Sequence, residues 1–152
     1  MHRLATMAAL LVVSLLAMPA CALGSDDTPA NEQSITDLQQ KIETAQPREQ
    51  CFLYAELIHD MTEVSIQQYA QGHDVKANAL LRQVQALTRK LHQTMTENDK
   101  RLKRAEILLR RTAFRLNEMM HDSSYQDRTV LAETLATVNK ADNDAMLQVF
   151  KQ

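Results

Sequence analysis

The 152-residue chain carries a formal net charge of −2, and 45% of its residues are hydrophobic but only 4% aromatic. A chain of this length forms one domain at most, and its charge balance gives no basis for general nucleic-acid binding. With two glycines in the whole chain, glycine-rich loops that cradle phosphates are also excluded. Helix-favouring residues dominate, and no β-branched run bounded by turn residues predicts a strand. The composition therefore predicts an all-α protein.

The N-terminus has the pattern of a secretory signal peptide over residues 1–22. Arg3 precedes a mainly apolar run, residues 4–17, and Ala20-Cys21-Ala22 fits a small-residue cleavage site. The run is short for a membrane span and no second one follows. We therefore expect an exported, periplasmic or secreted protein, with residues 23–33 as a flexible tether.

The two cysteines have different expected roles. Residues 18–21 resemble a degenerate lipobox, so the alternative to cleavage after Ala22 is a lipoprotein anchored through Cys21. In the mature chain Cys51 has no cysteine partner within the molecule. It lies on the apolar face of its helix near Tyr54, which predicts a buried structural thiol. A reactive thiol or a disulfide between two chains is the alternative.

We expect residues 34–152 to form a single helical domain. A short amphipathic helix is predicted over 34–44, and a second from Pro47, a residue suited to a first helical turn, to about Gln71. Gly72 suits the left-handed position past a helix end, and Asp74 is a suitable N-cap for the next helix. Such a short link makes the two flanking helices antiparallel neighbours.

The stretch from Asp74 to His121 is the axis of the expected antiparallel bundle. Its apolar residues keep the helical period: Leu80, Val84, Leu87, Leu91, Met95, Leu102, Ala105, Leu109, Ala113, Leu116 and Met120. One continuous helix would be about 70 Å long. Thr96-Glu97-Asn98-Asp99 resembles a capping box, which would instead start a new helix near Glu97 and give a compact four-helix bundle. Because Asn98 falls in an unbroken apolar stripe, we favour the continuous helix.

A last helix is predicted after Ser124, which with Asp127 three residues later forms a cap. Its apolar stripe consists of Leu131, Leu135, Val138, Ala145 and Val149. Asp142 lies within this stripe, and an unpaired carboxylate there would be costly. We therefore expect it to have a basic or amide partner on the 74–121 stretch. No internal repeat is evident in the sequence.

Two Glu-x-x-His pairs, Glu56-His59 and Glu118-His121, match the spacing used by di-iron four-helix bundles. The helical period directs both pairs away from the apolar stripes, and no inward glutamate is predicted on the other helices. We therefore expect these four side chains to lie in solvent and to bind no metal. No nucleophile–base constellation or cofactor motif occurs either, so the expected protein is not an enzyme.

A basic run lies between Lys100 and Arg115, with Glu106 as its one acidic residue. The candidate interaction surface consists of Lys100, Lys103, Arg104, Ile107, Arg110, Arg111, Phe114 and Arg115. One interpretation is a solvated helix face whose charges meet acidic neighbouring helices. This is the interpretation that we favour. However, Ile107 and Phe114 also lie away from the apolar stripe, so the helix is either sandwiched by other helices or offers a docking surface for an acidic protein or for anionic lipid headgroups.

The run Pro47-Arg48-Glu49-Gln50-Cys51-Phe52-Leu53-Tyr54-Ala55-Glu56-Leu57, with Lys100-Arg101-Leu102-Lys103 and Arg115-Leu116, resembles a family of uncharacterised secreted bacterial helical proteins. This resemblance covers most of the mature chain. It implies export and an all-helical fold, and it assigns no activity, ligand or functional residue.

The predicted function is that of a non-enzymatic secreted or periplasmic helical protein. It would act by protein–protein interaction, including self-association through coiled-coil packing. One alternative is a bundle that binds a small ligand or a metal. Another is a membrane-surface module that uses the basic face of residues 100–115.

Overall fold

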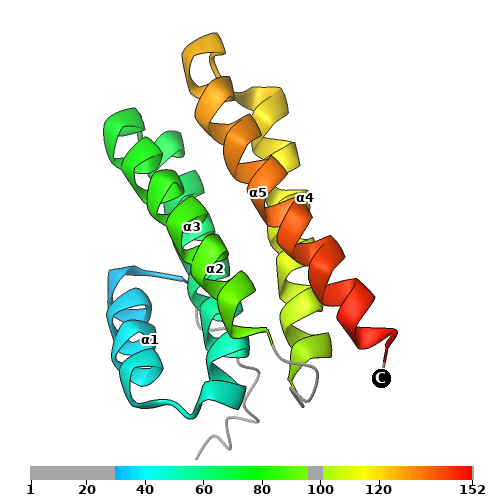
Figure 1. The fold of residues 1–152 in the computed structure, drawn as a ribbon. Coiled ribbons are helices and arrows are strands. Elements are labelled where there is room, and N and C mark those ends of the chain that lie inside the picture. The colour runs from blue at the N-terminus through cyan, green and yellow to red at the C-terminus, as the bar shows by residue number, and fades with distance from the viewer. Residues whose placement is uncertain (1–29, 96–100, 152) are drawn as a thin grey trace, which may run out of the picture.

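The computed structural model describes residues 30–95 and 101–151, in which five α-helices form a bundle (Figure 1). The helices are α1 (Glu32–Thr44), α2 (Pro47–Ala70), α3 (Asp74–Thr94), α4 (Leu102–Asp122) and α5 (Tyr125–Val149). The prediction of an all-α helical bundle is confirmed. Within the described residues, no helix is long and apolar enough to cross a bilayer. The expected signal peptide and the Thr96–Asp99 capping box lie outside the described residues.

Local side-chain hydrogen bonds define several helix ends. Asn31 Oδ1 accepts a hydrogen bond from the Ser34 backbone N–H at 2.9 Å, so α1 begins inside the stretch predicted as tether. Gly72 has φ of +76°, the left-handed conformation predicted for it. Ser124 Oγ accepts from the Asp127 backbone N–H, as predicted for the start of α5. Asp74 is the first residue of α3 and not its N-cap, so that prediction was one position off.

The favoured interpretation of one continuous helix from Asp74 to His121 is wrong. The α3 helix ends at Thr94, Met95 has an extended backbone, and a separate helix, α4, begins at Leu102. Among the described residues α3 and α4 are not adjacent helices, because each packs side by side with α2 and α5. An unbroken helix about 70 Å long would extend far beyond its neighbours. Folding back lets both halves bury their apolar stripes in one core.

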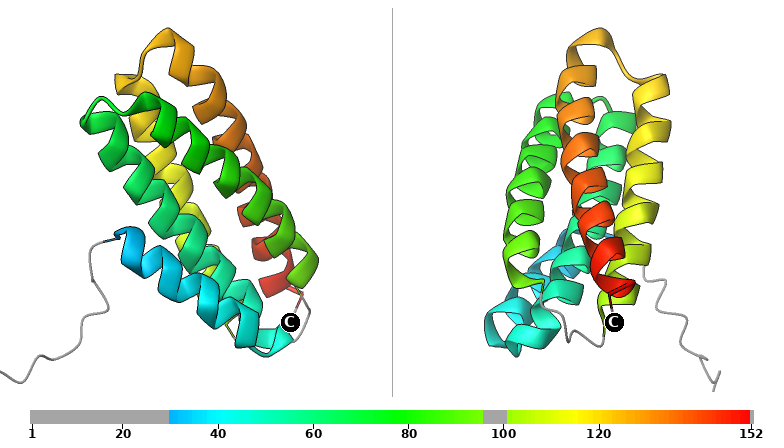
Figure 2. Two further views of the ribbon diagram at one scale, coloured as in Figure 1. Left: turned by 90° about the vertical axis from the view of Figure 1, so that its left-hand side faces the viewer. Right: turned by 45° about the vertical axis from the view of Figure 1, so that its right-hand side comes forward.

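The bundle consists of two antiparallel hairpins, α2–α3 and α4–α5, stacked in the same direction (Figures 1 and 2). Along α2 and α4, His59 contacts Thr112 and Glu63 contacts Arg115, so these two helices run parallel. The same holds for α3 and α5, where Asn78 and Gln85 donate hydrogen bonds to Asp127 and Thr134 respectively.

The two hairpins repeat one spacing of buried residues. In α3 the buried positions are Ala77, Leu81, Val84, Thr88 and Leu91, and in α5 the corresponding positions are Asp127, Leu131, Thr134, Val138 and Ala141. In α2 and α4 the corresponding buried pairs are Cys51/Leu102, Ala55/Glu106, Ile58/Leu109, Thr62/Ala113 and Ser65/Leu116. Steps that alternate between three and four residues are typical of coiled-coil seams. The repeat is therefore structural, and the sequence does not display it because the paired residues differ in type.

Helix α1 covers a second side of α2, where Leu57, Met61 and Val64 are buried. Its own Leu38 and Ile42 are buried in turn. The Ser34 hydroxyl donates to Asp60 Oδ2 at 2.7 Å, and the Gln67 amide donates to the Ala30 carbonyl at 3.3 Å. The helix therefore lies antiparallel to α2, on the opposite side of it from α4 (Figure 2).

We predict that Leu131→Ala lowers the free energy of unfolding by about 2–5 kcal/mol, because Leu131 is fully buried where the two hairpins meet. Leu147→Ala is the matched control on the same helix, since Leu147 is 55% exposed. It should change stability by at most about 0.5 kcal/mol. Urea denaturation measures both values. Equal losses for the two variants would contradict the placement of the core.

Candidate interaction site on helix α4

One side of α4 is buried in the bundle and the opposite side displays apolar residues to solvent. Ile107 is 52% exposed and Phe114 is 61% exposed. They lie two turns apart, about 10 Å along the helix axis. Exposed cationic side chains lie among them, and we define the α4 outer face as Lys103, Ile107, Arg110, Arg111 and Phe114. A basic and apolar surface on one rigid helix is a candidate for protein docking.

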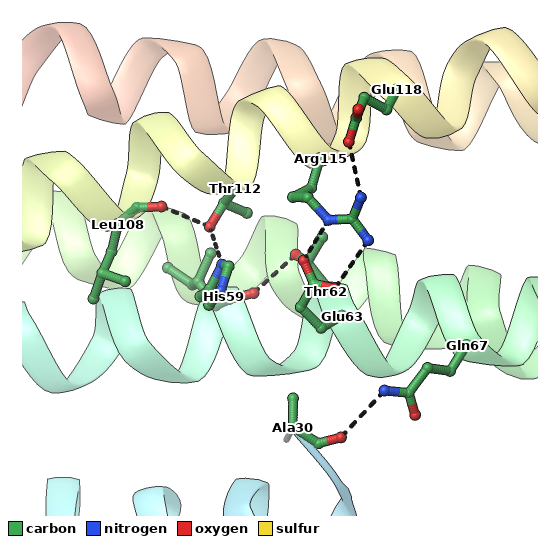
Figure 3. A network of polar contacts seen from close by, with 10 residues as sticks. Ala30, His59, Thr62, Glu63, Gln67, Leu108, Thr112, Arg115 and Glu118 are labelled. Atoms are coloured by element: carbon green, nitrogen blue, oxygen red, sulfur yellow. Dashed lines mark hydrogen bonds and ion pairs between the residues drawn. The ribbon is translucent and has the colours of Figure 1, made fainter. Parts of the chain in front are cut away.

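Two arginines of the predicted surface belong instead to the contact between α2 and α4. The Arg104 guanidinium lies 5.4 Å from the centroid of the Phe52 ring. Arg115 Nε donates to Glu63 Oε1 at 2.8 Å, and its Nη1 donates to Glu118 Oε2 at 2.8 Å (Figure 3). Arg104 stays exposed. Arg115 is half-buried and pairs with Glu63 of α2, which agrees with the interpretation that basic charges of this face meet an acidic neighbouring helix. Lys100 of the same prediction lies outside the described residues.

His59 faces α4, whereas it was predicted to lie in solvent (Figure 3). Glu118 and His121 are exposed, as predicted. Its Nδ1 lies 3.0 Å from Thr112 Oγ1, whose hydroxyl donates to the Leu108 carbonyl. The Thr112 oxygen is therefore an acceptor for the Nδ1–H of a neutral imidazole. Burial lowers the pKa of His59 below the ordinary 6.5, and Arg111 adds to this effect whereas Glu63 opposes it.

The two Glu-x-x-His pairs do not form a metal-binding group in the described part of the chain. His59 lies between α2 and α4, whereas Glu118 pairs with Arg115 and His121 is exposed. Across residues 30–95 and 101–151, no group of three His, Cys, Asp or Glu side chains is placed to hold a metal ion.

Cys51 is fully buried, as predicted for a structural thiol. It forms no disulfide in the described part of the chain. Because the thiol is enclosed by the bundle, reaction with an external oxidant requires the helices to open.

Asp142 lacks the hydrogen-bonding partner predicted for it. Its Oδ1 is buried and accepts no hydrogen bond from the described residues. Burial raises the pKa of this carboxyl, and the charge of Arg110 opposes that change. Arg110 itself is paired with Glu106 within α4.

The surface is hollowed at two places that the sequence did not predict. One hollow of about 290 Å³ lies between α3 and α5, where Asp144 Oδ2 lies 3.2 Å from His92 Nδ1 and 2.7 Å from Lys140 Nζ. These partners already satisfy the carboxylate. A second hollow of about 310 Å³ is lined by Met120, His121, Arg128 and Ala132 of α4 and α5. Residues from different helices build both hollows, so no local motif indicates them.

No protein-family model, curated protein or solved structure matches the chain. The molecule is therefore placed by its architecture, an all-α bundle of two stacked hairpins capped on one side by α1.

We predict that His59 makes stability depend on pH. Because its pKa in the folded protein lies below 6.5, the unfolded chain binds the proton more readily. The free energy of unfolding should therefore fall as the pH drops through about 6.5, until the folded-state pKa is passed. His59→Gln should remove this component in urea denaturation between about pH 8 and pH 5. The exposed control, His121→Gln, should retain it, and identical profiles for wild type and His59→Gln would contradict the assignment.

Proposed function

We propose that this protein is a non-enzymatic, secreted or periplasmic helical protein that binds a protein partner through the α4 outer face. The observation that carries the proposal is the exposure of Ile107 and Phe114 in the middle of α4. Other exposed large apolar residues in the described chain lie at helix ends: Val75, Tyr125, Leu147 and Phe150. The backbone in the middle of a packed helix is held in place by the bundle, so no backbone has to be ordered when a partner binds there, which lowers the entropy cost of binding.

The shape of this surface supports binding rather than catalysis. Ile107 and Phe114 project from the outside of a helix, whereas enzymes and small-ligand proteins usually enclose their substrates in a concave pocket. Aromatic residues and arginine are the residue types that dominate binding energy at protein interfaces. Phe114, with Arg110 and Arg111 nearby on the same helix, provides that combination.

The charge of the face favours an acidic partner. Lys103, Arg110 and Arg111 are exposed around the two apolar side chains, and of these Arg110 is paired with Glu106. Such a potential steers an acidic protein toward the face and selects against basic ones. An anionic membrane surface shares this chemistry and is the competing interpretation.

Export is proposed from the sequence pattern of residues 1–22, which resembles a secretory signal peptide. It is consistent with the enclosed state of Cys51 within the bundle, since a lone thiol in an oxidising compartment is protected by burial.

A photo-crosslinking amino acid placed at position 114 in the native host tests the proposal. We expect one dominant cross-linked protein whose attached segment is acidic and amphipathic. The matched control is the same substitution at Tyr125, which is 88% exposed but lies away from the α4 outer face, and it should not capture that protein. The same mass spectra should show a mature N-terminus at Leu23.

Other outcomes would contradict particular parts of the proposal. Cross-links to lipid would replace the protein partner with a membrane surface, and cross-links to a second copy would replace it with self-association. Equal capture from positions 114 and 125 would remove the α4 outer face as the site. An intact Met1 on the functional protein would contradict export.

A further inference from the structure

Because the two hairpins repeat the same packing, each residue of α2 has an equivalent on α4, and this shows which side of α2 corresponds to the α4 outer face. On α2, the residues that contact α4 are Phe52, His59 and Glu63. Aligning the buried residues of the two helices, Cys51 with Leu102 and Ile58 with Leu109, matches each α2 residue with one on α4. The residues of α4 that correspond to Phe52, His59 and Glu63 are Lys103, Arg110 and Phe114. Lys103, Arg110 and Phe114 of the α4 outer face therefore lie on the same side of the repeat that α2 uses to hold α4. Arg111 corresponds instead to Asp60, which bonds Ser34 of α1, and so lies at the border of the face nearer to α2.

The opposite end of the stack is already covered. On α2, the buried residues Leu57, Met61 and Val64 lie on the side packed by α1. Their equivalents on α4 are Leu108, Thr112 and Arg115. The last two of these contact α2, so α2 covers α4 on the same side on which α1 covers α2. Helices α1, α2 and α4 thus follow one another in a single layer, each covering the next. In stacked repeat proteins the terminal units carry a polar outer face. Among the described residues, α1 covers one end of this stack, whereas the α4 end exposes Ile107 and Phe114.

The residues that join α2 to α4 indicate which kind of helix would fit the α4 outer face. Between α2 and α4, Glu63 meets Arg115, and the Phe52 ring meets two arginines, so an acidic and aromatic side packs against a basic side. The α4 outer face is basic, with Phe114 and Ile107 between its cations. A helix that packs there must therefore bring acidic residues and a narrow apolar stripe.

The described helices of a second copy of the chain are not suited to pack on the α4 outer face. The described helices α1 to α5 all bury their apolar stripes in their own bundle. Although α1 carries exposed acids (Glu32, Asp37 and Glu43), its Leu38 and Ile42 are buried.

We propose that an acidic amphipathic helix of a partner protein lies on the α4 outer face, parallel to α4, in the position that α4 itself takes on α2. This inference rests on the proposed function and specifies the partner and its orientation. The hollow lined by Met120, His121, Arg128 and Ala132 lies between α4 and α5 at the C-terminal end of α4. It gives an apolar residue near the C-terminal end of the partner helix a place to insert.

A peptide derived from α4 provides the probe. It has the sequence of Leu102–Asp122 with Arg104→Glu and Arg115→Glu, so that the side that packs on α2 becomes acidic. The control peptide keeps both arginines. We expect the acidic peptide to bind the full-length protein at least about tenfold more tightly than the control in fluorescence anisotropy, because like charges on facing helices repel.

Variants of the protein locate the bound peptide. Phe114→Ala should weaken binding of the acidic peptide at least about tenfold, as expected for an aromatic anchor. Val75→Ala is the matched control and should leave the affinity unchanged, because Val75 is 84% exposed and lies on α3, which is not adjacent to α4. A nitroxide label at the N-terminus of the peptide should broaden the NMR signal of Lys103 and spare that of Glu118 if the two helices are parallel.

Each alternative result overturns the inference. Equal binding of both peptides, no binding at millimolar concentration, insensitivity to Phe114→Ala, or broadening at Glu118 would each be incompatible with a helix stacked in register on α4. If cross-linking at position 114 still captures an acidic protein after any of these results, the proposed function stands and only the stacked, parallel arrangement is lost.

Discussion

The contact between the two parallel helices α2 and α4 is the constraint on which the rest of the structure depends. The contact combines buried residues at steps of three and four with polar pairs such as Glu63–Arg115. Apolar seams of this spacing bring helices together, and polar pairs within them select one register over its neighbours. Because α2 and α4 are held side by side, α3 and α5 are brought together as well. The α4 outer face is then left at the edge of the stack.

The fold class and several helix ends could be predicted because they depend on local chemistry. Gly72 provides the left-handed turn between α2 and α3, and Ser124 caps α5 through its own hydroxyl. The break between α3 and α4 could not be predicted from the helical spacing of the apolar residues. Leu91 and Leu102 lie on two different helices but are buried in the same core, so the phase continues across the break. Periodicity records which face is buried and not whether the helix is unbroken.

The residues of the candidate site also divide into those whose position could be predicted from the sequence and those whose position could not. Ile107 and Phe114 were correctly placed outside the apolar stripe, because their exposure follows from the helical period alone. His59 was placed wrongly in solvent, since it contacts Thr112 on another helix. The contacts of Arg104 with Phe52 and of Arg115 with Glu63 were not predicted individually, because they also join two helices. Long side chains at the border of a buried face reach neighbouring helices, and only the packing of the helices decides which neighbour they meet.

The stacked arrangement of α2 and α4 is tested most directly by a nuclear Overhauser spectrum of the isotope-labelled protein. His59 Nδ1 lies 3.0 Å from Thr112 Oγ1, so we expect cross-peaks between the His59 ring protons and the Thr112 methyl group. In a protein whose α3 and α4 formed one continuous helix, these residues would be tens of ångströms apart, because a helix rises about 1.5 Å per residue. Absence of these cross-peaks, with both residues assigned and folded, would contradict the stack and the open face it leaves on α4.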